Sequence, residues 1–210
     1  SLLTVNILPG NIDAGTVEDN EFPNLLDKYN NKTSGFNLHY MIDAKFQLRG
    51  VPATGYRFYQ WDDEPVGQEV SSQTTMIAGG VARTAKFGID AWETKAITPI
   101  TTEVTFPGVF VQRELDNESY STICLPFELK TLTGTPYEGA SVLKFVGVEK
   151  VEENGVVKAN MKFAPVEFTE TDYMQPGVPY LIKPVSPILG GEEVIFKQAK
   201  CPVVANPNPY

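Results

Sequence analysis

Residues 120–129 (YSTICLPFEL) constrain the fold more than any other stretch of this chain. Apolar side chains fall on both faces of an extended chain over residues 120–125. This pattern is typical of a strand that is covered on both sides and lies in the middle of a core. Pro126 cannot donate to a strand ladder, so regular pairing should end there. Residues 179–183 (PYLIK) are expected to form the partner strand.

The composition favours an all-β protein. The 210 residues include 17 Gly, 16 Pro, 12 Phe and 9 Tyr, a mixture that favours many short strands joined by turns. The length suits one large or two small domains. The chain begins with Ser1 and has no basic leader, so we expect a processed chain or a piece of a longer one.

The charge is acidic throughout. The net charge is −9; residues 1–102 carry 8 basic and 12 acidic side chains, and residues 103–210 carry 9 and 14. No basic stripe is available to meet phosphates, so neither nucleic acid nor an anionic membrane surface is an expected partner. No apolar run approaches the roughly 18 residues of a membrane helix, so we expect no membrane insertion.

Five alternating runs in the first half of the chain predict strands, at residues 3–8, 15–17, 45–51, 56–61 and 81–87. Residues 18–45 lose this alternation for much of their length and are expected to form an acidic, Asn-rich insertion, in which Pro23 is a candidate start for one short helix. Residues 89–102 show no clear period and are expected to be a linker, with a domain boundary near residues 98–103.

Three motifs in this half follow one another in a recognisable order. They are Gly15-Thr16-Val17, then residues 52–58 (PATGYRF) with Trp61-Asp62, then residues 82–87 (ARTAKF). This order resembles the divergent internalin-type B repeat. The resemblance implies a small β-grasp-like module over residues 1–98, of a kind often found in tandem arrays on bacterial surface proteins. One copy is visible in this sequence.

The second half is expected to continue in strands. A strand over residues 104–113 should be broken at Pro107-Gly108, and residues 194–197 should form another strand. Asn154-Gly155 lies between alternating runs at residues 142–151 and 156–166, which is the strongest short-range signal for a β-hairpin. On the second run, alternate residues from Val157 to Phe163 are apolar and face one way, with polar residues opposite.

The motifs at residues 121–127 (STICLPF) and 176–183 (PGVPYLIK) give a second resemblance. They are similar to the T-x-C-L-P-F and P-Y-L-I-K strands of a β-sandwich domain that is common in Bacteroidetes cell-surface proteins. The resemblance implies an antiparallel β-sandwich over residues 103–210 and export to a cell surface as part of a larger modular protein. It implies no activity.

Candidate catalytic and metal-binding residues are few. His39 is the single histidine, and no Gly-x-Ser-x-Gly elbow accompanies it. Residues 62–64 (DDE), with Asp43 or Glu69, offer oxygen ligands for calcium, but solvated turn carboxylates explain these residues more simply. No pair of carboxylates lies in a setting that indicates glycoside hydrolysis. We therefore predict no catalytic residue, no metal site and no cofactor.

The two cysteines, Cys124 and Cys201, leave two alternatives open. An even count permits one disulfide, which would close a long loop. Because Cys124 lies within a predicted strand, a small buried thiol is the simpler expectation.

Four aromatic residues form a candidate ligand platform: Tyr56, Tyr59, Trp61 and Trp92. They lie at strand ends or in the predicted linker, where exposed rings could stack on sugar faces or on a partner protein. On a regular strand Tyr59 and Trp61 would share one face, with Tyr56 and Phe58 on the other. Packing in a core or between domains is the alternative, and the B-repeat resemblance implies core positions for Phe58 and Trp61.

Together these features predict a two-domain, mainly β fragment of a secreted or surface-anchored bacterial protein, located outside the cell or on its outer surface. The expected role is non-catalytic, as a structural spacer or adhesion module, with a glycan or a surface protein as the candidate partner. The alternative is a carbohydrate-binding module of a glycan-utilisation system. That alternative requires coplanar, exposed rings at Tyr59 and Trp61.

Overall fold

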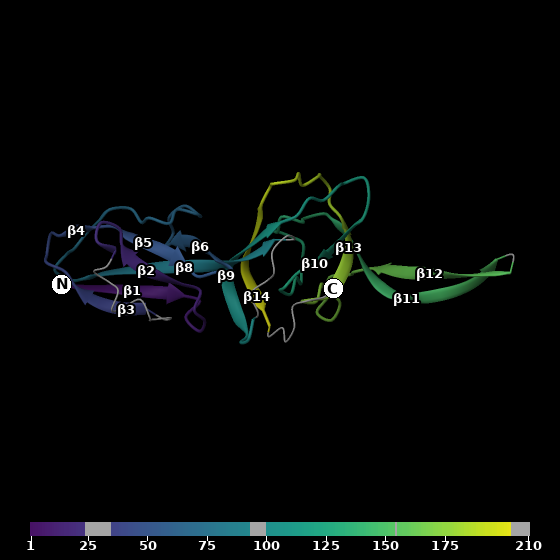
Figure 1. The fold of residues 1–210 in the computed structure, drawn as a ribbon, viewed down its shortest axis with the longest axis horizontal. Helices are drawn as coiled ribbons and strands as arrows, with labels where there is room; N and C mark the ends of the chain where they lie inside the picture. The colour runs from purple at the N-terminus through teal and green to yellow at the C-terminus, as the bar shows by residue number, and fades with distance from the viewer. Residues whose placement is uncertain (24–34, 93–99, 154, 203–210) are drawn as a thin grey trace.

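The computed structural model describes residues 1–23, 35–92, 100–153 and 155–202, and these residues form a mainly β protein without α-helices. This confirms the predicted mainly β class. The molecule is elongated, with the N-terminus near one end and a two-stranded hairpin at the other (Figure 1). The strands are β1 Leu2–Leu8, β2 Gly15–Asp19, β3 Gly35–His39, β4 Lys45–Phe46, β5 Leu48–Pro52, β6 Tyr56–Trp61, β7 Thr74–Thr75, β8 Val81–Trp92, β9 Val104–Gln112, β10 Ser121–Cys124, β11 Ser141–Glu153, β12 Val156–Pro165, β13 Pro179–Lys183 and β14 Val194–Cys201.

Strand β8 is the centre of a mixed six-stranded sheet. It pairs in parallel with β1 along residues 81–86 and with β9 along residues 89–92. Ile89 pairs with both Tyr56 of β6 and Val109 of β9, so these two strands lie on opposite edges of β8. By the same reasoning β1 also lies opposite β6. Strands β1 and β9 therefore occupy successive lengths of the same edge of β8.

The predicted linker is wrong over its first four residues, because β8 continues through residues 89–92. Ile89 is fully buried, and it extends the alternation of Ala85 and Phe87. A close approach of β8 to β9 makes this possible: a Cβ on Gly88 would lie 2.4 Å from the carbonyl oxygen of Gly108. Residues 93–99 of the predicted linker lie outside the described residues.

Two clusters of buried side chains divide along β8. The first core contains buried residues from Leu3 to Phe87, and the second contains buried residues from Ile89 to Cys201. Ile12 and Tyr56 are partly buried and pack against both clusters. The continuous strand β8 thus contributes to both cores.

The first core differs from the sequence prediction in two places. Strand β3 lies within the segment that was expected to be irregular, and its Phe36 is buried. The strand predicted over residues 45–51 is divided at Gln47, because β4 pairs with β7 whereas β5 pairs with β2. The short helix that was predicted from Pro23 falls largely on residues 24–34, which lie outside the described residues.

Strand β10, which lies within residues 120–129, belongs to a four-stranded antiparallel sheet with the order β10-β13-β11-β12. Its predicted partner is confirmed, since Ile123 pairs with Tyr180 of β13. It also ends at Cys124, before Pro126, as predicted. Coverage on both faces is wrong: Ile123 is buried but Thr122 is exposed, because one face of this sheet lies on the second core and the other faces solvent.

The predicted break in β9 is also wrong, because the strand runs through Pro107 without interruption. In its partner β14, Lys197 pairs with Gly108 and Ala199 pairs with Phe106. The residues between them, Gln198 and Pro107, are not paired. Gln198, opposite Pro107, has a φ of 53°. The irregularity of β14 at this point accommodates a proline that has no N–H to donate.

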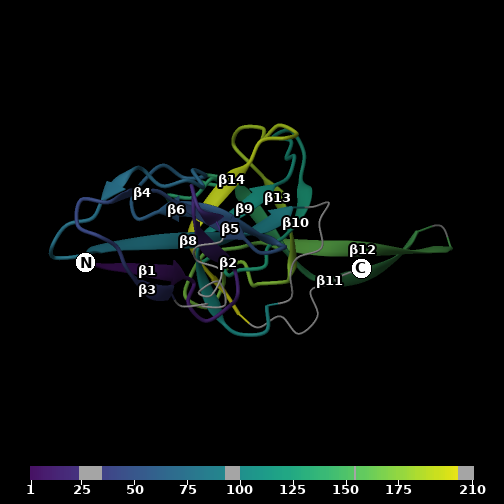
Figure 2. The same cartoon turned by 60° about the vertical axis from the view of Figure 1, so that its left-hand side comes forward.

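The predicted hairpin is confirmed, with Glu153 of β11 paired to Val156 of β12 and Gly155 at a φ of 76°. Strand β13 pairs with β11 only as far as Lys144. Beyond this point β11 and β12 extend away from the body as a two-stranded ribbon (Figures 1 and 2). We call residues 145–163 the arm.

Within the described residues no helix has the length and apolar character needed to cross a membrane.

Candidate functional site

The four residues of the predicted aromatic platform do not form one surface, because β6 carries a bulge. Its pairing with β8 skips from Phe58 to Gln60, so Tyr59 is the extra residue. Phe58 and Trp61 consequently point to the same face, with ring centroids 5.3 Å apart. The predicted sharing of a face by Tyr59 and Trp61 is therefore wrong.

Trp61 is a core residue with 0% of its surface exposed. Its indole Nε1 donates a hydrogen bond to the backbone oxygen of Glu69 at 2.8 Å. Phe58, its neighbour in the core, also meets Phe87 edge-on at 5.4 Å. The B-repeat resemblance implied buried positions for Phe58 and Trp61, and both are buried.

Tyr59 is also buried, but it belongs to neither of the two cores. Its ring meets Phe110 of β9 at 6.1 Å, and the position of Gly108 directly beneath the ring leaves no room for a side chain there. Burial raises the pKa of the Tyr59 hydroxyl. Because Tyr59 and Trp61 are both buried and point to different faces of β6, the pair offers no stacking surface for a sugar.

Among the platform residues whose side chains the structure describes, Tyr56 is the one that is partly exposed. It borders a pocket of about 320 Å³ that is also lined by Asn11, Asp13, Thr101 and Phe106, among others. This volume is near the lower limit of small-molecule sites. Burial, with the nearby charge of Asp13, raises the pKa of the Tyr56 hydroxyl. The side chain of Trp92 lies outside the described residues.

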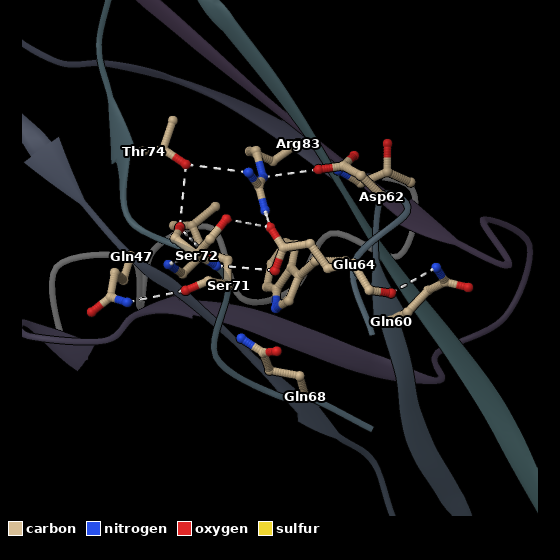
Figure 3. Close-up of polar contacts among 12 residues, drawn as sticks. Gln47, Gln60, Asp62, Glu64, Gln68, Ser71, Ser72, Thr74 and Arg83 are labelled. Atoms are coloured by element: carbon tan, nitrogen blue, oxygen red, sulfur yellow. Dashed lines mark hydrogen bonds and ion pairs between the residues drawn. The ribbon is translucent and has the colours of Figure 1, made fainter. Parts of the chain in front are cut away.

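The acidic turn that follows β6 binds an arginine. Arg83 of β8 extends its guanidinium between Asp62 and Glu64, as Figure 3 shows. Its Nε lies 2.9 Å from Asp62 Oδ2, its Nη2 contacts Glu64 Oε1, and its Nη1 donates to Thr74 Oγ1 at 3.2 Å. The side chain is 12% exposed, and it passes over the Trp61 ring with Cζ 5.9 Å from the centroid.

Glu64 has further partners that favour its ionised form. Its carboxylate accepts hydrogen bonds from the backbone N–H and the hydroxyl of Ser72, at 3.0 and 2.6 Å. Burial opposes ionisation, but the hydrogen bonds from Ser72 and Arg83 and the charge of Arg83 outweigh it, so the pKa of Glu64 is lowered. Asp62 and Glu64 are thus committed to Arg83 and to backbone groups, which favours a structural role over calcium binding.

The other candidate residues are scattered. His39 is exposed at the end of β3. Within the described ranges, no group of three or more His, Cys, Asp or Glu side chains is placed to hold a metal ion. Cys124 and Cys201 are both free, so the structure does not form the disulfide that the sequence left open. Burial raises the pKa of the Cys201 thiol to about 12 and also raises that of Cys124.

The most prominent surface feature is the arm, which the sequence did not identify as a site. Residues that are directly opposite in an antiparallel pair share a face, and the register places Phe145 with Phe163 and Val148 with Met161. The apolar side chains of this face are these four with Ala159 and Val157, and the same register places the charged side chains of Lys150 and Glu152 on it, opposite Ala159 and Val157. Its larger apolar members are strongly exposed: Phe145 52%, Val148 55%, Val157 66%, Met161 68% and Phe163 37%. We call this the apolar arm face.

The opposite face of the arm is mainly polar, with Val151 and Val156 lying among ion-paired lysines and glutamates. Lys162 lies 3.0 Å from Glu149, and Lys158 lies 2.5 Å from Glu153. The alternation of residues 157–163 already indicated one apolar and one polar face for β12. The sequence carried no signal that the apolar arm face would be left uncovered by the rest of the molecule.

Comparison with protein-family models, with curated proteins and with solved structures gave no match for this chain.

Proposed function

We propose that this chain is a non-catalytic module of a secreted or surface-anchored bacterial multidomain protein, with a structural spacer or adhesion role. The observation that carries the proposal is the continuity of β8. It pairs with β1 at one end and with β9 at the other, and it contributes to both cores. A load applied to one core therefore passes to the other through one strand rather than through a flexible joint.

The geometry of this connection suits a spacer. Strands β1 and β8 are parallel, with six consecutive residue pairs from Leu3–Val81 to Leu8–Lys86. If β1 is pulled along its length, all the hydrogen bonds between these strands are loaded together. A hairpin pulled at its base breaks its bonds one after another. Shear along β1 should therefore need a much larger force than opening of a hairpin.

The finer architecture is part of the same proposal. We infer a β-grasp-like B-repeat module over residues 1–98 and an antiparallel β-sandwich over residues 103–210. The mixed sheet around β1 and β8 supports the first. Support for the second comes from the second core, which gathers side chains from β9 and β14 of one sheet and β10, β11 and β13 of another. The two resemblances in the sequence are the basis for placing the protein at the outer cell surface.

Force spectroscopy on the single chain tests the spacer role. The chain is pulled first through residues 2 and 202, and then, as an internal control, through residues 141 and 165 at the base of the β11–β12 hairpin. We expect the first geometry to resist a several-fold higher force, because β1 is loaded in shear. Equal forces in the two geometries would remove the structural argument for a spacer.

The burial of Tyr59 and Trp61 removes the platform that a carbohydrate-binding module was expected to use, and the pocket beside Tyr56 is the observation that still favours this second candidate. Tyr56 stacks near Phe106, with centroids 6.1 Å apart, so a single partly exposed ring borders this pocket. A glycan-array screen compares the intact chain with Tyr56→Ala. A specific hit that Tyr56→Ala abolishes would favour this second role over the spacer.

A further inference from the structure

We propose that the arm is a self-association element, and that its apolar face packs against the same face of a second copy of this chain. This inference goes beyond the spacer or adhesion role and does not depend on it. Its basis is the exposure, size and charge of the arm.

The arm needs a cover. A two-stranded ribbon is marginally stable in water unless a third strand or another layer packs on it. Among the described residues, β11 and β12 pair only with each other beyond Lys144. The Phe145–Phe163 ring pair, at 5.9 Å, lies at the base of a face whose apolar side chains continue to Val157 near the tip, where Lys150 and Glu152 share the face. Exposed apolar patches of this kind mark interaction surfaces.

The area fits a two-copy interface. The five large side chains of the apolar arm face together expose roughly 500 Å², taking about 150–200 Å² for a fully exposed side chain of this size. Two such faces would bury about 1,000 Å², which is where specific protein interfaces begin.

The charges of the arm also favour a second copy. The whole chain carries a net charge of −9, so the bodies of two copies repel each other. Residues 145–163 are neutral, because three lysines balance three glutamates; these are Lys150, Lys158, Lys162, Glu149, Glu152 and Glu153. The arm is thus a part of the molecule that another copy can approach without net repulsion.

The position of the arm determines how two copies of the chain can be placed in a dimer. It extends along the long axis of the molecule, away from both cores (Figures 1 and 2). Two arms packed face to face and antiparallel place the two bodies at opposite ends, where they do not collide. The contact is then isologous, with the base of each arm meeting the tip of the other. The acidic tip, with Glu152 and Glu153, disfavours insertion of the arm into a lipid surface.

Sedimentation velocity of the full chain over a range from about 1 to 200 µM tests the proposal. We expect a concentration-dependent monomer–dimer equilibrium. Met161→Lys should weaken the dimer by about 100-fold or more, because it buries a charge in the apolar contact. Asn160→Lys is the matched control: it adds the same charge to the neighbouring residue, on the polar face and opposite Glu149, and should leave the equilibrium within about twofold.

A second variant guards against misfolding of the arm. Val148→Thr keeps a β-branched residue on β11 and should weaken the dimer by about tenfold. Fluorescence of the two tryptophans, Trp61 and Trp92, reports whether the body of each variant retains its fold. A wild-type chain that stays monomeric at 200 µM overturns the proposal, as does a dimer that both Met161→Lys and Val148→Thr leave intact. Binding of a monomeric chain to lipid vesicles would likewise overturn it.

Discussion

The substitution Arg83→Met tests how the first core is stabilised. In the folded protein the Arg83 guanidinium balances Asp62 and Glu64 and passes over the Trp61 ring. Methionine retains part of the packing volume but removes the positive charge, and it leaves two partly buried carboxylates facing each other. Removing one partner of a buried ion pair costs about 3–5 kcal/mol. Because Asp62 is partly exposed, we expect a loss near the lower limit, about 3 kcal/mol.

Thermal and urea unfolding, followed by tryptophan fluorescence, measure this loss. For a chain of this size about 3 kcal/mol corresponds to a fall in Tm of about 6–12 °C. Lys130→Met is the control, since Lys130 is exposed and lies 3.5 Å from Glu128. The control should change the free energy of unfolding by less than about 1 kcal/mol. An Arg83→Met variant that unfolds with the same free energy as Lys130→Met would refute the reasoning.

The same substitution should change how stability depends on pH. The folded-state pKa of Glu64 is lowered below its ordinary value of 4.5. Stability from a carboxyl with a depressed pKa is present above its unfolded pKa and is lost as the pH falls through the folded pKa. The wild type should therefore lose stability as the pH falls below 4.5. Without Arg83 this loss should be smaller, and an unchanged acid profile would contradict the assignment.

Three further substitutions or measurements follow from the structure. Trp61→Ala should lower the free energy of unfolding by about 3–5 kcal/mol because it empties a fully buried site, and an unchanged Tm would show that the ring is not in a core. Gly88→Ala should cost about 1–3 kcal/mol, since its Cβ would lie 2.4 Å from the Gly108 carbonyl oxygen; urea unfolding at or near wild-type values would contradict this close approach. Thiol titration should find Cys201 unreactive in the folded chain and both Cys124 and Cys201 reactive in denaturant; finding no thiol after denaturation would establish a disulfide instead.

Local patterns predicted much of the strand content. The alternation of residues 56–61 matched β6 to the residue, and the Asn-Gly signal placed the hairpin between β11 and β12. The pairing of residues 120–124 with 179–183 was also predicted, from two short apolar runs far apart in the chain. These features depend on neighbouring residues or on strong apolar composition, both of which are visible in a sequence.

The candidate site was harder to predict, because its geometry depends on the placement of single residues. One bulge at Tyr59 moved Phe58 and Trp61 to a common face, and no alternation rule shows where an extra residue will be inserted. The partner of the acidic turn after β6 was equally hidden. Arg83 lies about twenty residues further along the chain, and only the antiparallel pairing of β6 with β8 brings it to Asp62 and Glu64.

The sequence by itself determined the fold class, most strand positions and the two faces of the arm, because period-two alternation, turn residues and composition act over a few residues. The tertiary structure decided which of those faces are covered. Trp61 lies in a core while Met161, also an apolar residue on a predicted strand, is exposed. Burial depends on what packs from elsewhere in the chain, and in the arm the neighbouring strand β13 ends its pairing at Lys144 and leaves the apolar arm face open to solvent.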